Sequence, residues 1–114
     1  MNTIILLIVY VLIGALSIGL AVPLIQGRVK PNPWYGVRLP KTLKDPETWY
    51  AVNAYFGRRF AVYGLFIAAS GVVLSPIGFI RHTGSVTYML VEAVLITAGL
   101  AWITVDTLRY LRKF

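Results

Sequence analysis

Three long apolar segments without Lys or Arg constrain the fold of this chain more than any other feature. The segments are Thr3 to Ile25, Phe60 to Phe79 and Ser85 to Val105. A helix of roughly 20 apolar residues crosses the hydrocarbon core of a bilayer. Charged residues make up only 13% of the 114 residues, about half the share usual in soluble proteins. The sequence therefore predicts an all-α integral membrane bundle of three transmembrane helices.

Breaker and capping residues mark the ends of these helices. Pro23 disturbs the hydrogen-bond ladder near the end of the first helix, and polar residues follow it. Asp45 and Pro46 form an N-cap and a first helical position, so the second helix begins well before its apolar part. The resulting single membrane domain, 1–114, has a first helix at about 3–26, a long ordered loop at 27–45, a second helix at about 46–79 and a third at about 85–110. Prolines and glycines in the loop forbid a continuous helix there.

The basic residues predict how the helices are oriented. Of the eleven Lys and Arg residues, all except Arg81 fall in the loop, at the start of the second helix or at the carboxyl terminus. Arg58 and Arg59 mark the boundary of the second apolar segment. The positive-inside rule places these residues in the cytoplasm and the amino terminus outside. Such residues also attract anionic lipids of the bilayer.

Several functional classes are excluded by composition. The formal net charge is +7, but the basic residues lie at the ends of apolar segments rather than in a stripe, so we expect no nucleic-acid partner. The chain has no cysteine and a single histidine, His82. No metal-ligand cluster, phosphate-binding glycine loop or nucleophile with an adjacent base is recognisable. We therefore expect no cofactor, no metal and no enzymatic activity.

Small residues recur four apart in each helix, a spacing that lets helices approach closely in lipid. The series are Ala15/Gly19, Gly57/Ala61, Gly64/Ala68 and Ala93/Thr97/Ala101. Packing of the three helices against each other is the favoured interpretation. A homo-oligomer seam is the alternative.

Glu92 is the one carboxylate within an apolar segment. Tyr10 and Ser70 lie at about the same depth in the other helices, and either hydroxyl could hydrogen-bond it. The favoured interpretation is a neutral Glu92 that holds helices together. A proton or ligand site is the alternative, because ionisable groups inside a membrane are costly.

The loop contains the run Trp34-Tyr35-Gly36-Val37-Arg38, which a solvated connector does not need. Its aromatic residues, together with Trp49 and Tyr50, could simply anchor the chain at headgroup depth. That role does not explain why Trp49, Asn53 and Gly57 share one face of the second helix. We expect the Asn53 amide to satisfy the backbone of the loop near Gly36, as a structural latch.

The same residues carry a resemblance to a known family. The run from Asn32 through Trp34, Tyr35, Gly36, Val37 and Arg38, followed by Trp49 and Asn53, resembles the signature of the SdpI family of immunity factors. The positions that match it are Asn32, Tyr35, Gly36, Arg38, Pro40, Thr42, Trp49, Asn53 and Gly57. The resemblance covers Asn32 to about Arg59 residue by residue.

This resemblance implies a non-enzymatic protein of the cytoplasmic membrane of a prokaryote that protects its cell from a membrane-active toxin peptide. A scaffold that captures a soluble regulator at the basic cytoplasmic face, and a small oligomeric proton-coupled transporter that uses Glu92, are the alternatives. For Arg38, held between Pro33 and Pro40, we expect a bond to a backbone carbonyl, to the carboxylate of Glu47 or Asp106, or to a lipid phosphate.

Overall fold

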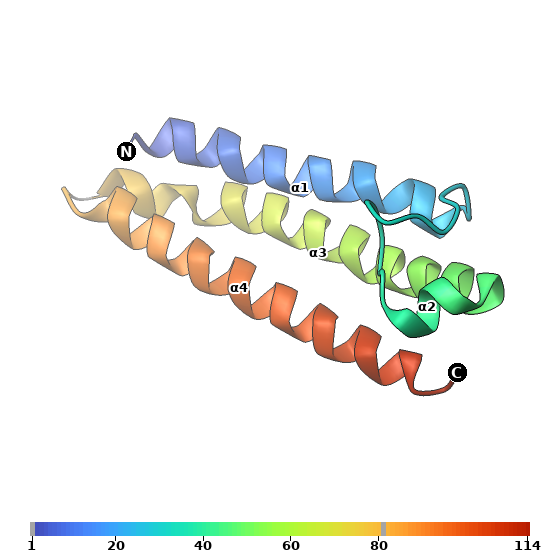
Figure 1. Cartoon of the computed structure of the whole chain (residues 1–114). Helices are drawn as coiled ribbons and strands as arrows, with labels where there is room; N and C mark the ends of the chain where they lie inside the picture. Colours follow the sequence, from blue (N-terminus) through green and yellow to red (C-terminus); the bar gives the residue numbers. More distant parts are fainter. Residues whose placement is uncertain (1, 81) are drawn as a thin grey trace.

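The computed structural model describes residues 2–80 and 82–114, which form four helices and no strand. Three helices, α1 (Thr3–Ile25), α3 (Pro46–Ile80) and α4 (Gly84–Leu111), are long and apolar enough to cross a membrane, as the sequence predicted. Their ends lie within one residue of the expected positions. The helix α3 lies between α1 and α4 (Figure 1), which touch each other only slightly.

Capping residues explain where the long helices begin. The side chain of Asn2 accepts a hydrogen bond of 2.8 Å from the backbone N–H of Ile4 at the start of α1. Before α3, the Asp45 carboxylate accepts bonds from the backbone N–H of Glu47 and the hydroxyl of Thr48, at 3.3 and 2.9 Å. The predicted N-cap at Asp45 is therefore confirmed. In the connection expected between α3 and α4, Arg81 lies outside the described residues.

Glycines at seven-residue intervals line the face of α3 that packs against α1. The series is Gly57, Gly64, Gly71 and Gly78. On α1 a second series with the same period is buried, namely Thr3, Tyr10, Ser17 and Leu24. A Cβ atom added at Gly64 would lie 2.6 Å from the carbonyl oxygen of Gly14, so the two backbones meet closely there. Seven-residue repeats on both helices are typical of a left-handed helix pair.

Tyrosine hydroxyls join α3 to α4. The fully buried Tyr88 donates a hydrogen bond of 2.5 Å to the carbonyl of Gly71. Further along, Tyr63 donates to the carbonyl of Ile96 at 3.0 Å. Both acceptors lie within helices, so each phenol keeps its polar group satisfied inside an apolar interface. The α3–α4 contact therefore uses tyrosine side chains from both helices, whereas the α1–α3 contact places glycines of α3 against α1.

The expectation about small residues is correct for α3 and wrong elsewhere. Gly57 and Gly64 are buried against α1. In contrast, Ala15 and Gly19 are exposed, and a Cβ added at Gly19 would meet nothing within 4 Å. The α4 series Ala93, Thr97 and Ala101 is also exposed. These residues do not pack the helices because α4 contacts α3 through its tyrosine-bearing face, and α1 contacts α3 through the seven-residue series.

The chain between α1 and α3 contains one turn of helix that the sequence analysis did not predict. This helix, α2, spans Pro40–Lys44, with Pro40 at its first position. It lies against α3 at the end of the molecule that carries the carboxyl terminus (Figure 1). Five residues are too few for a periodic pattern to be visible, and the prolines do exclude a longer helix.

Candidate functional site

Asn32 fixes the first turn of the loop between α1 and α2. Its Oδ1 atom accepts hydrogen bonds of 2.8 Å from the backbone N–H groups of both Trp34 and Tyr35. Its Nδ2 atom donates to the carbonyls of Lys30, at 2.7 Å, and Tyr35, at 3.2 Å. One side chain thus satisfies four backbone groups, which is the mechanism by which asparagine stabilises turns.

Asn53 joins the loop to α3 and is almost fully buried. Its Oδ1 atom accepts a bond of 2.6 Å from the backbone N–H of Val37, and its Nδ2 atom donates to the carbonyl of Trp49 at 2.9 Å. Gly36 has a φ of 111°, and a Cβ added there would lie 2.6 Å from Oδ1 of Asn53. A side chain at Gly36 would therefore displace the amide. The latch expected at Asn53 is confirmed.

Trp49 attaches the loop to α3, and Thr42 fixes the chain where the loop enters α2; neither side chain is exposed. The indole Nε1 of Trp49 donates to the carbonyl of Val29 at 2.7 Å. The hydroxyl of Thr42 donates to the carbonyl of Val37 at 2.8 Å and accepts from the N–H of Leu39 at 2.9 Å. Trp49 is therefore not a headgroup anchor, because its indole lies inside the protein.

The two aromatic residues of the loop have opposite surroundings. The Tyr35 phenol donates a hydrogen bond to the carbonyl of Leu20 in α1, and burial raises the pKa of that phenol. Trp34 has 85% of its surface exposed. Tyr50, half-buried, faces Gly27. Trp34 thus remains the aromatic residue of the loop that is available to a membrane surface or a partner.

We call the residues that shape the loop and hold it on α1 and α3 the loop clasp; they are Asn32, Tyr35, Gly36, Thr42, Trp49 and Asn53. Two further positions of the motif support it. Pro40 begins α2, and Gly57 packs on α1, where an added Cβ would lie 3.0 Å from the carbonyl oxygen of Ala21. Most of the motif that sequence analysis singled out therefore shapes one ordered loop.

Two basic residues of the motif region stay exposed. The guanidinium of Arg38 donates to the backbone carbonyl of Pro33. The backbone-carbonyl interpretation is thus correct, and the carboxylate partners Glu47 and Asp106 are wrong. Arg58 is also exposed, and no polar contact of its side chain occurs among the described residues. Trp34 and these two arginines are therefore solvent-exposed side chains of the motif region.

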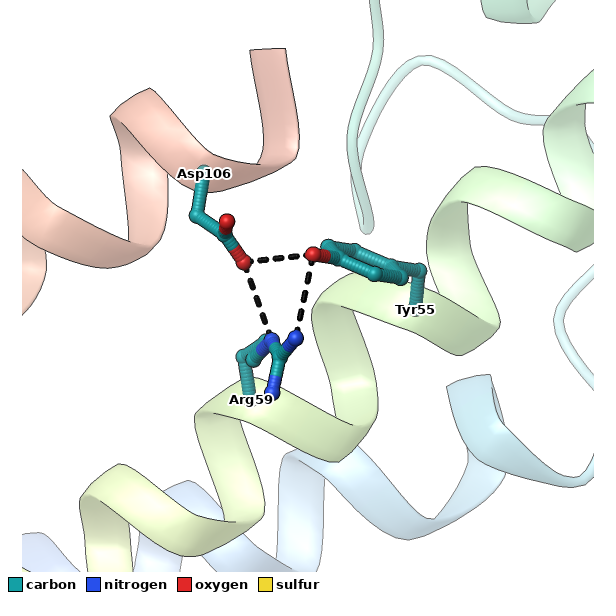
Figure 2. A network of polar contacts seen from close by, with 3 residues as sticks. All are labelled: Tyr55, Arg59 and Asp106. Atoms are coloured by element: carbon teal, nitrogen blue, oxygen red, sulfur yellow. Dashed lines mark hydrogen bonds and ion pairs between the residues drawn. The ribbon is translucent and has the colours of Figure 1, made fainter. Parts of the chain in front are cut away.

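The Asp106 carboxylate bonds Tyr55 and Arg59 instead, a network that the sequence did not predict. Its Oδ2 atom accepts bonds from Nε of Arg59 at 2.9 Å and from the hydroxyl of Tyr55 at 2.6 Å (Figure 2). Arg59 also donates to the Tyr55 hydroxyl at 3.1 Å. The ring of Tyr55 stacks on Tyr110, with centroids 4.0 Å apart. This network fastens α4 to α3, and the four-residue spacing of Tyr55 and Arg59 was its only sequence signal.

Glu92 lies fully buried between α3 and α4. Its Oε2 atom accepts a hydrogen bond of 3.1 Å from Ser70, so one of the two expected hydroxyl partners is confirmed. Tyr10 instead packs edge-on against Tyr88, with ring centroids 5.3 Å apart. Among the described residues Oε1 of Glu92 has no partner. The carboxyl group therefore joins two helices through one of its oxygen atoms.

Three helices long enough to cross a membrane, with a polar loop clasp at one end, define a small polytopic membrane protein. The chain belongs to the SdpI/YfhL protein family, whose model matches residues 28–105. The matched region includes the whole loop clasp, α3 and most of α4. No curated protein and no solved structure matches the chain.

Proposed function

We propose that the chain lies in the cytoplasmic membrane of a prokaryote with its amino terminus outside and its loop clasp inside. The uneven distribution of basic residues supports this orientation. The loop, α2 and the carboxyl terminus lie at one end of the molecule, and the amino terminus lies at the other (Figure 1). Basic residues in the loop and at the carboxyl terminus would then meet the same anionic leaflet.

Variants with one introduced cysteine test this orientation, because the chain contains no other cysteine that could be labelled. Trp34 and His82 are both exposed and lie near opposite ends of the long helices. We expect a membrane-impermeant maleimide to label His82→Cys in intact cells and to label Trp34→Cys only after permeabilisation. Labelling of Trp34→Cys in intact cells would show that the orientation is reversed.

We further propose that this protein gives its cell immunity to a membrane-active toxin peptide. Membership of the SdpI/YfhL family carries this proposal. The loop clasp supports this proposal, because an ordered loop presents the exposed Trp34 in a fixed place beside Arg38, as a flexible connector would not. A rigid surface loses little conformational entropy when it binds a partner. No reacting group is needed for such a role.

Expression of the chain in a toxin-sensitive bacterium tests this proposal. The cells are challenged with a panel of secreted membrane-active peptides from related bacteria. We expect the chain to raise the inhibitory concentration of at least one peptide several-fold, and Trp34→Ala to abolish the gain at equal membrane levels. Trp102→Ala is the matched control, because Trp102 is also largely exposed but lies on α4. Sensitivity equal to that of the parent cells for every peptide would contradict an immunity role.

A proton-coupled carrier is the second candidate, favoured by the buried carboxyl group of Glu92 with its unpartnered oxygen. Glu92→Gln separates the two candidates in the same assay, since glutamine keeps an acceptor for the Ser70 hydroxyl but carries no titratable proton. Immunity by surface recognition predicts full protection in this variant. Loss of both protection and proton-linked flux, with normal insertion, would favour the carrier.

A further inference from the structure

A second feature of the loop is a groove that it forms with α3 and α4. Its walls are mainly apolar and include Val37 and Leu39 of the loop, Phe56 of α3 and Leu108 of α4. The groove has a volume of about 330 Å³ and opens to the outside of the protein, because Leu108 is 44% exposed. An open apolar groove beside an ordered loop can hold the hydrocarbon chain of a lipid through van der Waals packing, since a lipid tail in a membrane is already out of water.

Basic groups lie beside this groove. Arg38 lines it and is exposed, and its guanidinium bonds only the carbonyl of Pro33 among the described residues. Lys41 reaches across to α4, where its Nζ donates to the carbonyl of Leu111 at 3.0 Å. Neither side chain forms an ion pair within the described part of the chain. The groove thus combines apolar walls with positive charge that is not neutralised by a carboxylate.

A groove on another part of the α3–α4 surface gives an internal comparison. It is lined by Arg59, Val62, Phe66 and Trp102, among others. There the guanidinium is already paired with Asp106 at 2.9 Å. An anion would gain less from a cation whose charge is neutralised than from Arg38. Charge therefore distinguishes the Arg38 groove from the other one.

We infer that the Arg38 groove binds one anionic phospholipid. Its acyl chain lies against Val37, Phe56 and Leu108, and its phosphate bonds the outward N–H groups of Arg38, with Lys41 nearby. A guanidinium offers several donors in a fixed planar array that suits phosphate oxygens. Packing of the acyl chain against the groove adds contacts that a free phosphate ion lacks. This site does not depend on an immunity role, and a lipid held there would brace the loop against α4.

Native mass spectrometry of the full chain in detergent tests the inference with phosphatidylglycerol and phosphatidylcholine. We expect one tightly bound phosphatidylglycerol and no comparable binding of phosphatidylcholine. Arg38→Gln should weaken phosphatidylglycerol binding about tenfold, the effect of losing a charge-assisted contact. The matched control is Arg28→Gln, which removes an exposed arginine that does not line the groove. Equal affinity for both lipids, or equal effects of the two arginine variants, would overturn the inference.

Filling the groove tests the acyl-chain contact separately. Thr104 and Thr97 are both exposed on α4, but only Thr104 lines this groove. Thr104→Phe should therefore weaken phosphatidylglycerol binding, and Thr97→Phe should leave it unchanged. Excess inorganic phosphate should not displace the lipid. Displacement by phosphate, or no change in Thr104→Phe, would mean that the groove does not hold a lipid.

Discussion

Replacement of Gly64 by valine is expected to lower the free energy of unfolding by about 3 kcal/mol, as overpacking of a tight interface does. A Cβ atom at this position would lie 2.6 Å from the carbonyl oxygen of Gly14 and 2.8 Å from Cβ of Ser17. Both neighbours are held by the α1 backbone, so neither can move alone. The helices α1 and α3 must separate instead, and α1 has little contact with α4 to compensate.

Gly19→Val is the matched control for this prediction. Gly19 is a helical glycine like Gly64 but lies in α1, and a Cβ there meets nothing within 4 Å. Its replacement should change stability by no more than about 0.5 kcal/mol. Unfolding of the purified proteins in mixed detergent micelles measures both effects. If the two valine variants unfold at the same denaturant fraction, the close α1–α3 contact does not stabilise the protein.

The long helices were predictable because their signals are local. Three apolar runs and the Asp45 cap placed the ends of α1, α3 and α4 within one residue of their positions in the structure. The latch at Asn53 was also predictable, since Trp49 and Asn53 share a helix face and asparagine readily satisfies loop backbone. The seven-residue glycine series is also present in the sequence. The four-residue spacing instead predicted a packing role for Gly19, which is exposed.

The partners of Arg38 and Asp106 could not be predicted in the same way. Charge placed both residues near one end of the molecule, which made an ion pair between them reasonable. Their actual partners depend on how α4 is rotated and shifted against α3, and no local pattern specifies that register. Asp106 faces Tyr55 and Arg59 on the interhelical side (Figure 2), while Arg38 turns back to its own loop. Non-local geometry also created the groove beside Arg38.

Replacement of Asn53 by leucine is expected to release the loop while the three long helices remain formed. Leucine has a similar size but cannot accept the bond from the N–H of Val37 or donate to the carbonyl of Trp49. An unsatisfied buried backbone group costs about 1–3 kcal/mol. Opening of the loop should therefore become roughly 10- to 100-fold more frequent, since 1.4 kcal/mol corresponds to a factor of ten.

Trypsin reports this opening directly, because Arg28, Arg38 and Lys41 lie within the loop segment between α1 and α3. Cleavage of these bonds should accelerate by the same factor in Asn53→Leu when opening is fast relative to cleavage. Asn2→Leu is the matched control, since it also replaces an amide by leucine but removes the cap of α1 at the far end. It should weaken α1 slightly and leave loop cleavage unchanged. Wild-type cleavage rates in Asn53→Leu would mean that the other members of the loop clasp hold the loop, and that the Asn53 amide is dispensable.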